Sequence, residues 1–283
     1  MKTVRHIGAV LLSGVFALLL IAHAYAAPAT PFPQRIVSLV PNITEGLYLL
    51  GVQDRVVGVT TYCQRPPEAQ SKERVGAVVE VNVEKILSLQ PDLVIASPLT
   101  DQKQIKKLLD LGVRIEVFQA PQDFEGLCAG FLRLGQLVGR EYEAREIIAR
   151  AEGELAVIIE EVKGLPGPRV FVQIGEKPLV VAGSDSFIDD VVSCAGGINI
   201  AGEDKTSVYS REEVVRRNPD IILIAKMGMA GEREKAVWVR YETIRAVQDD
   251  RIYTVDPYRF CSPTPVSFVE SVKALVRLFH GSQ

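Results

Sequence analysis

The chain has 283 residues and a formal net charge of -3, with 47% apolar and 24% charged residues. This composition is typical of a packed globular protein and excludes a disordered one, and the slight excess of acids argues against a nucleic-acid-binding protein, which is normally basic. The length fits two modest domains better than one.

The first 26 residues have the pattern of a secretory signal. Residues 7–22 are apolar and almost uncharged after a positively charged start, and Ala24 and Ala26 occupy the two positions that a signal peptidase reads. We predict cleavage after Ala26 and a secreted mature chain, residues 27–283. No cysteine follows the apolar run, which argues against a lipoprotein; an uncleaved membrane anchor is the alternative.

The histidine content limits the chemistry of the mature chain. Of three histidines, His6 and His23 lie in the predicted signal, which leaves only His280. A zinc site built from several imidazoles is therefore excluded, and a catalytic set containing histidine would depend on a residue near the end of the chain. We predict no catalytic residues, no metal site and no resident cofactor.

Strand and helix patterns alternate in the first part of the mature chain. Short β-branched runs predict strands at 35–40, 56–60, 93–96 and 113–118, and amphipathic stretches predict helices at 44–50, 83–90 and 102–111. This alternation indicates a parallel sheet covered by helices on both faces.

The alternation stops between residues 123 and 163. Gly139 divides this segment into two predicted helices, and the second, residues 141–163, carries an apolar stripe of 3.6-residue period. That helix would be roughly 34 Å long at 1.5 Å per residue, which is longer than a crossover between strands needs.

The alternation then resumes. Strands are predicted at 169–174, 221–225 and 252–255, and helices at 188–194, over most of 232–247, and at 265–280. We therefore predict an α/β protein with two Rossmann-like lobes, each a parallel sheet flanked by helices, joined by one long α-helix. The expected boundaries are 1–26 for the signal, 27–138 for the N-terminal lobe, 139–165 for the connecting helix and 166–283 for the C-terminal lobe.

An internal repeat supports two copies of one lobe. Residues 84–95 align without gaps on residues 212–223, at a constant offset of 128. Each copy reads as a capped helix, a Pro-Asp pair and a buried strand; the alternative is that this arrangement recurs independently in many α/β proteins. Ligands of parallel sheets bind beyond the carboxyl ends of the strands, so two facing lobes predict a ligand cleft between them.

Several segments together resemble one known family. They are residues 35–45, 57–62, 66–67, 84–96, 194–199 and 210–212. In order and spacing they resemble the periplasmic substrate-binding proteins of ABC importers for cobalamin, ferric siderophores and haem, most closely the cobalamin-binding type. The resemblance implies a monomer that captures a corrinoid or similar large metal-chelate in the periplasm and delivers it without chemistry.

The resemblance also implies a partner, an importer permease dimer with a cytoplasmic ATPase. The family's two permease-docking glutamates fall on Glu84 and Glu212, one in each copy of the repeat. The alternative is local: Asn82 and Ser210 can cap helices, and acids in a first helical turn are stabilised by the helix dipole.

The resemblance places ligand contacts on Tyr62 and Asp256. Three positions where cobalamin binders carry Trp or Phe are occupied here by Val78, Val180 and Thr206, so the aromatic lining is absent. The further candidates for ligand contact are Pro41, Asn42, Thr61, Met227, Tyr258 and Arg259. Most of these follow predicted strands, and ordinary loop structure is the alternative for each.

Two other functions remain alternatives to a corrinoid-binding protein. The first is a ferric-siderophore or haem-binding receptor of the same class. The second is an α/β enzyme of chelatase or metallocluster type, although no glycine-rich phosphate loop is present. A sensor or adhesin that presents a bound ligand is a further possibility on the same fold.

Four cysteines belong to the predicted secreted chain, where disulfides can form. Cys63 follows Tyr62, and Cys261 follows Phe260 in the loop after the last strand. We predict a Cys63–Cys261 bridge across the mouth of the cleft; four free thiols are the alternative.

Overall fold

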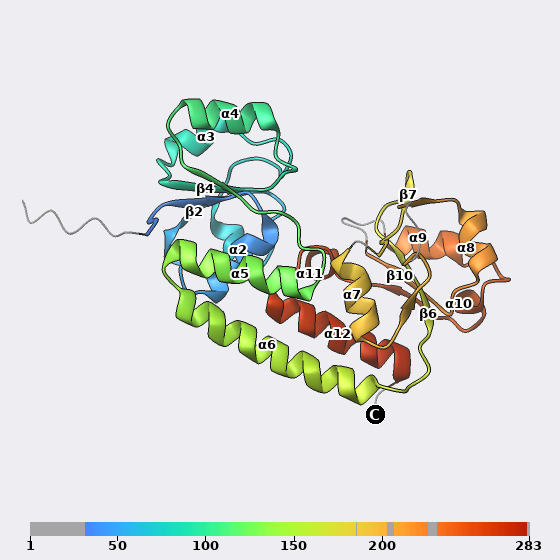
Figure 1. The fold of residues 1–283 in the computed structure, drawn as a ribbon. Coiled ribbons are helices and arrows are strands. Elements are labelled where there is room, and N and C mark those ends of the chain that lie inside the picture. The colour runs from blue at the N-terminus through green and yellow to red at the C-terminus, as the bar shows by residue number, and fades with distance from the viewer. Residues whose placement is uncertain (1–31, 185, 203–206, 226–230, 282–283) are drawn as a thin grey trace, which may run out of the picture. The chain divides into compact units, whose positions relative to one another are not determined.

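The computed structural model describes residues 32–184, 186–202, 207–225 and 231–281. Its centre consists of two parallel sheets. The predicted signal lies outside the described residues. The first sheet has the strand order β3-β2-β1-β4-β5 (Figure 1). Its strands are β1 (Ile36–Ser38), β2 (Val56–Val59), β3 (Glu73–Arg74), β4 (Leu93–Ala96) and β5 (Ile115–Val117).

Helices cover both faces of the first sheet. The connecting elements are α2 (Pro41–Leu49), η1 (Gln53–Arg55), η2 (Pro67–Ser71), α3 (Val83–Ser88) and α4 (Gln102–Asp110). Because successive side chains of a strand point to opposite faces, Ile36 packs with Leu47 of α2, whereas Val37 packs with Ile86 of α3. Figure 1 shows α3 and α4 on one side of the sheet and α2 on the other.

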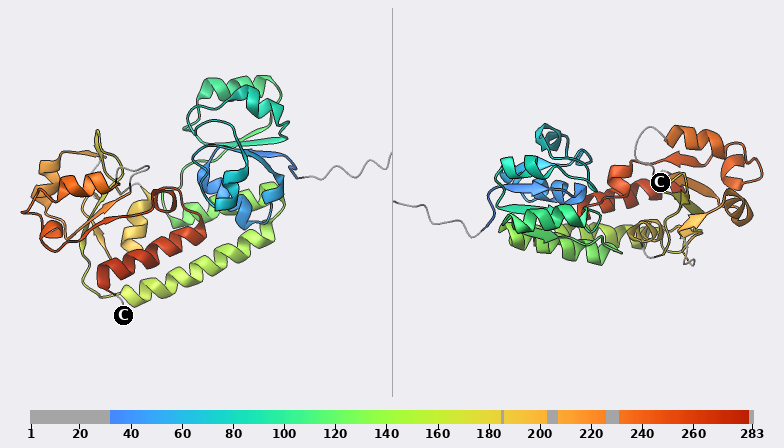
Figure 2. Two further views of the ribbon diagram at one scale, coloured as in Figure 1. Left: turned by 180° about the vertical axis from the view of Figure 1, so that it is seen from behind. Right: turned by 90° about the horizontal axis from the view of Figure 1, so that it is seen from above.

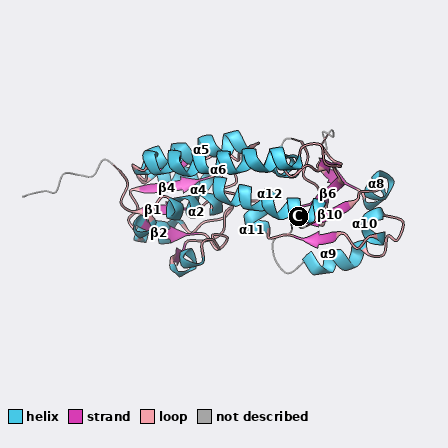
Figure 3. Cartoon of the chain, turned by 90° about the horizontal axis from the view of Figure 1, so that it is seen from below, coloured by secondary structure: helices cyan, strands magenta, loops and turns pink. Residues whose placement is uncertain are grey.

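The second sheet has four parallel strands in the order β11-β10-β6-β8. They are β6 (Arg169–Gln173), β8 (Ile198–Asn199), β10 (Ile221–Ile224) and β11 (Ile252–Thr254), and β7 (Leu179–Val180) pairs antiparallel with β9 (Val208–Tyr209). The helices are α7 (Phe187–Cys194), α8 (Arg211–Arg217), α9 (Gly231–Trp238), α10 (Arg245–Gln248) and α11 (Pro257–Phe260). Figure 3 shows β6 and β10 with α8, α9 and α10 around them. The predicted α/β class with helix-flanked parallel sheets is confirmed.

Helices α5 (Phe124–Val138) and α6 (Glu141–Val162) connect the first sheet to the second. The last helix, α12 (Pro265–His280), packs beside them. Lys273 of α12 bonds Glu154 of α6 at 2.6 Å, and both views in Figure 2 show the two helices side by side. Of the helices in the described part of the chain, none is long and apolar enough to cross a membrane.

The predicted division at Gly139 is confirmed. Gly139 ends α5 with a φ of 73°, a left-handed conformation that glycine adopts without the penalty a Cβ brings. A Cβ at this position would also lie 2.5 Å from the ring of Phe32. The segment 232–247 differs from prediction: it is broken between α9 and α10, and the buried Trp238 and Ile244 lie on either side of the break.

The sequence repeat corresponds to a repeated hydrogen-bond arrangement. The Asp92 carboxylate accepts the N–H groups of Gln34 at 2.7 Å and Arg35 at 3.0 Å, at the entry to β1. At the aligned position, the Asp220 carboxylate accepts the N–H of Arg169 at 2.8 Å, at the entry to β6. In both copies the aspartate thus joins the start of one strand to the start of its neighbour.

The residues just before each aspartate also correspond. Gln90 and Asn218, at the same 128-residue offset, both have positive φ, 48° and 46°. The Arg35 guanidinium donates to the Leu89 carbonyl at 2.7 Å, and the Arg169 guanidinium donates to the Arg217 carbonyl at 3.3 Å. The same helix-to-strand turn is therefore built twice.

Two glycine substitutions test this description of the long helices. Gly139→Ala should lower the free energy of unfolding by about 1–2 kcal/mol or more, because the residue has positive φ and lies against Phe32. Gly153→Ala, inside α6 with open space around it, should raise that free energy by about 0.5–1 kcal/mol. Urea unfolding of both variants measures the difference, and equal stabilities would contradict the Gly139 geometry.

Candidate ligand site and docking residues

Three loops at the carboxyl edge of the first sheet are tied together by backbone hydrogen bonds. The N–H of Thr61 donates to the Gly76 carbonyl at 2.9 Å, and the N–H of Asp101 donates to the Val79 carbonyl at 2.9 Å. The segments that follow β2, β3 and β4 are therefore one connected framework. Tyr62 stands on this framework with 39% of its surface exposed.

The other predicted ligand residues of the first sheet occupy the same edge. Pro41 and Asn42 form the first turn of α2, directly after β1, and both are half-buried. Thr61 is exposed, and Val78 is half-buried in the loop after β3. All of them follow carboxyl ends of strands, where parallel sheets bind ligands.

The second sheet contributes fewer described candidates. Val180 is half-buried, and its carbonyl accepts the N–H groups of Ile174 and Gly175 in a tight turn after β6. Thr206 and Met227 lie outside the described residues.

Asp256 and Arg259 have structural partners within the chain. The Asp256 carboxylate caps α11 by accepting the N–H of Tyr258 at 2.9 Å. The Arg259 guanidinium lies 3.5 Å from the Glu270 carboxylate of α12. Tyr258 and Arg259 are half-buried and Asp256 is exposed, so a ligand contact by any of them would add to these local roles.

Glu45 is a buried acid that the sequence analysis missed as a site residue. It is only 8% exposed, and it accepts a hydrogen bond from Arg65 at 2.6 Å. Burial raises the pKa of Glu45 to about 7 against the opposing effect of Arg65, with further contributions from Glu270, Arg259 and Asp256. The carboxyl of Glu45 in α2 is therefore within electrostatic reach of charged groups on α11 and α12.

Little in the sequence indicated that Glu45 and Arg65 would pair. Glu45 belongs to a segment that resembles the family, but its partner Arg65 is twenty residues away on another loop. Periodicity identifies which residues are buried in a helix, and it does not identify long-range ion pairs.

The predicted Cys63–Cys261 disulfide is wrong, because all four cysteines are free thiols. Cys63 is fully buried with its sulfur 3.1 Å from the Thr44 hydroxyl beneath α2. Cys261 instead donates to the Ala225 carbonyl at 3.6 Å in the second sheet, and burial raises the pKa of its thiol to about 11. The two side chains are held by different sheets, although both follow predicted ligand residues in sequence.

The two predicted docking glutamates occupy equivalent, exposed positions. Glu84 lies in the first turn of α3, which Asn82 caps, and its side chain is 87% exposed and 3.9 Å from Lys107. Glu212 lies in the first turn of α8, which Ser210 caps. Hydrogen bonds from its own backbone N–H and from Ser210 lower the pKa of Glu212, so it is ionised at neutral pH.

A buried polar network supports the start of α8. Arg211 pairs with Glu234 at 2.8 Å and lies over the Trp238 ring at 4.5 Å. Gln173, the last residue of β6, donates to Glu234 at 2.8 Å and accepts from the Trp238 indole at 2.7 Å. This network joins the end of β6 to the helix that carries Glu212.

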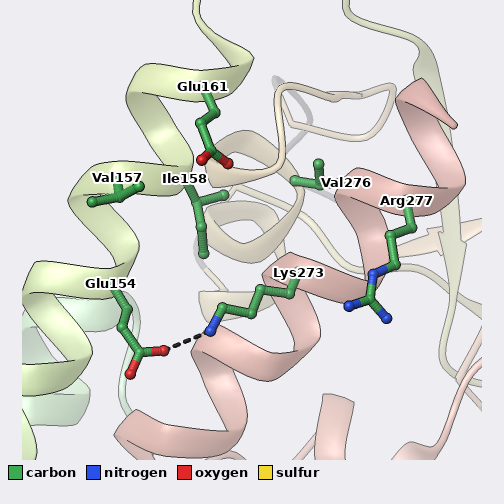
Figure 4. A pocket seen from close by; sticks show the side chains of 7 residues that line it. All are labelled: Glu154, Val157, Ile158, Glu161, Lys273, Val276 and Arg277. Atoms are coloured by element: carbon green, nitrogen blue, oxygen red, sulfur yellow. Dashed lines mark hydrogen bonds and ion pairs between the residues drawn. The ribbon is translucent and has the colours of Figure 1, made fainter. Parts of the chain in front are cut away.

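A groove lies between α6 and α12, on elements that carry none of the predicted site residues. It has a volume of about 360 Å³, and Figure 4 shows the Glu154–Lys273 ion pair at one end of it. Among the described residues, no group of three or more His, Cys, Asp or Glu side chains is placed to hold a metal ion.

Residues 36–258 match the model of a family described as periplasmic binding protein. The chain belongs to that family. It is 34% identical over 235 residues to YvrC of Bacillus subtilis (strain 168), described as an uncharacterized ABC transporter substrate-binding lipoprotein; the match covers 80% of this chain and 73% of the relative.

Two solved structures have the same fold as this chain. The vitamin B12-binding protein BtuF of Vibrio cholerae superposes with a TM-score of 0.75 and 26% identity, over 88% of this chain and 97% of that one. A periplasmic haem-binding protein from Pseudomonas aeruginosa superposes with a TM-score of 0.78 and 27% identity, over 89% and 94%.

These similarities decide the class of function. The chain is a substrate-binding protein of the class that serves vitamin B12, haem and siderophores, and proteins of this class work with ABC permease and ATPase components. The predicted family resemblance is confirmed. The prediction that the chain is not an enzyme is also confirmed, because the family consists of transport proteins.

The burial of Glu45 predicts a specific pH dependence of stability. A carboxyl whose pKa rises to about 7 on folding stabilises the native state fully below its ordinary pKa of 4.5, and this contribution is lost as pH rises to 7. In the wild type, the free energy of unfolding should therefore fall by up to about 3 kcal/mol over that range. In Glu45→Gln this fall should be absent. Urea unfolding between pH 4.5 and 8 measures it.

The matched control is Glu160→Gln, an exposed position on α6. Its stability should follow the wild-type pH curve. Curves for Glu45→Gln and wild type that stay parallel from pH 4.5 to 7 would contradict the raised pKa.

Proposed function

We propose that this protein captures a corrinoid, or a similar large metal-chelate, and delivers it to the permease dimer of an ABC importer with a cytoplasmic ATPase. The delivery role is supported by Glu84 and Glu212, which are exposed at equivalent positions of the repeat. Each lies in the first turn of a capped helix. One carboxylate from each copy matches a twofold partner that presents cations.

The ligand proposal is supported by the similarity to the vitamin B12-binding protein of Vibrio cholerae. The candidate ligand contacts include both polar and apolar side chains, namely those of Thr61, Tyr62, Val78 and Val180. Such a mixture suits a large ligand with an apolar ring face, although valines provide less contact area than aromatic residues. We propose that the ligand binds between the two lobes, at the carboxyl ends of the strands.

A haem or ferric-siderophore ligand is the second candidate. Tyr62 favours it, because an exposed tyrosine oxygen can ligate ferric iron, and the haem-binding protein of Pseudomonas aeruginosa is similar over most of both chains.

We also propose that the protein is located in the periplasm. A signal cleaved after Ala26 would release residues 27–283 into the periplasm as a monomer, with lobes at 27–138 and 166–283 around the helix of 139–165. The relative in Bacillus subtilis is described as a lipoprotein, whereas here no cysteine directly follows the apolar run.

A ligand panel tests the ligand class. Purified protein is titrated with cyanocobalamin, cobinamide, haemin and ferrichrome by calorimetry and visible absorption. A corrinoid should bind best, and Tyr62→Phe should leave its spectrum unchanged. A haemin complex whose Soret band shifts in Tyr62→Phe would support the second candidate, and binding of none of the four would contradict the proposed ligand class.

Charge reversal tests the docking role. Glu84→Arg with Glu212→Arg should abolish binding to the cognate permease–ATPase complex in nanodiscs, because like charges then face each other, while affinity for panel ligands stays unchanged. The control Glu146→Arg with Glu160→Arg changes two exposed glutamates of α6. Normal docking of the Glu84 and Glu212 double variant would leave the helix-dipole role as the explanation of these residues.

A further inference from the structure

Two apolar side chains at the carboxyl edge of the first sheet are strongly exposed. Leu99 is 69% exposed in the loop after β4, and Val79 is 59% exposed in the loop after β3. Isolated exposed apolar residues are common on protein surfaces and need no explanation. These two differ because their loops are bonded to each other and the loop of Val79 leads into the helix of a proposed docking residue.

Hydrogen bonds hold both loops in place. The Val79 carbonyl accepts the N–H of Asp101, two residues after Leu99, at 2.9 Å. The N–H of Val81 donates to the Gln104 side chain of α4 at 2.8 Å. The two apolar side chains therefore emerge from neighbouring, fixed stretches of backbone, so little conformational entropy remains to be lost when a partner covers them.

The same framework leads directly to Glu84. The N–H of Asn82 donates to the Val75 carbonyl at 2.7 Å, and the Asn82 side chain caps α3, whose first turn carries Glu84. Lys107 of α4 also lies 3.9 Å from the Glu84 carboxylate. Leu99 thus lies in a loop that is bonded to the loop of Val79, and the loop of Val79 leads into the helix that carries Glu84.

The exposure of these residues distinguishes them from the aromatic and apolar residues proposed to contact the ligand on the same edge. Tyr62 is 39% exposed, and Val78 is half-buried although it directly precedes Val79. Side chains that line a pocket are partly covered by its walls, whereas Leu99 is covered by little of the chain. This contrast favours a macromolecular partner over a small ligand.

We infer that Val79 and Leu99 form an apolar docking patch that packs against apolar side chains of the permease, beside the cation that pairs with Glu84. This inference rests on the proposed docking role of Glu84. Apolar contact around an ion pair excludes water and lowers the local dielectric, which strengthens the attraction between the charges. In the second copy Val208, two residues before the Ser210 cap, is also exposed.

The test compares matched exposed apolar residues on one lobe. The double variant Val79→Ser with Leu99→Ser should weaken docking of ligand-free protein to the permease–ATPase complex in nanodiscs by about tenfold, measured by biolayer interferometry. Its thermal unfolding and its affinities for cyanocobalamin and haemin should match wild type. The control is Leu109→Ser with Leu111→Ser at the far end of α4, where both residues are about half exposed, and it should dock normally.

The outcomes separate this inference from the docking role itself. Normal docking of the Val79 and Leu99 variant, together with lost docking of the Glu84→Arg, Glu212→Arg double variant, would overturn the patch and leave the docking role of the glutamates intact. Intact docking with weakened haemin or cyanocobalamin binding would also overturn it and assign the patch to the ligand site. Normal docking of the variant that carries both Glu84→Arg and Glu212→Arg would instead show that the proposed docking role itself fails.

Discussion

An aspartate at the entry to a central strand organises each copy of the repeat. Asp92 and Asp220 each stand between a helix and a buried strand, and each carboxylate accepts backbone N–H groups at the start of the neighbouring strand. Charge-assisted bonds of this kind are stronger than neutral ones. They align the starts of β1 with β4 and of β6 with β10. The helix before each aspartate then begins at the opposite, carboxyl edge, where Glu84 and Glu212 lie.

The two copies share this frame but differ in what fills it. Leu39 and Val83 belong to one apolar cluster in the first copy. In the second copy, Gln173 corresponds to Leu39, because each lies four residues after the arginine that enters the strand, and Arg211 corresponds to Val83. Gln173 and Arg211 both bond to the buried Glu234. A buried ion pair gives little net stability, but its directional bonds define one arrangement of its elements. The helix that carries Glu212 is therefore positioned by polar contacts, and the helix that carries Glu84 by packing.

Burial of charge also marks the place where α2 comes within electrostatic reach of α11 and α12. Removing Glu45 from water disfavours its ionised form, and Arg65 compensates only in part. Arg259 and Glu270 lie within electrostatic reach of the same carboxyl. The protein thus has a buried titratable group in α2, the helix whose first turn carries the ligand candidates Pro41 and Asn42. The fully buried Cys63 lies near it beneath α2.

Local physics allowed much of the fold to be predicted from the sequence alone. The division at Gly139, the final helix Pro265–His280, the strand Leu93–Ala96 and the caps at Asn82 and Ser210 depend on residues close in sequence, and all were predictable. The repeat and the family motifs located Glu84 and Glu212 for the same reason. Short strands such as β7 and β9 carry too few residues to show a period.

Tertiary structure decided which distant side chains meet. Glu45 pairs with Arg65, Arg259 is paired with Glu270, and Cys63 and Cys261 point into different sheets instead of toward each other. A sequence pattern gives the order of residues and the direction in which a strand ends. The side chain's final contacts depend on the balance of burial, charge and packing among segments far apart in the chain, and that balance exists only once the chain is folded.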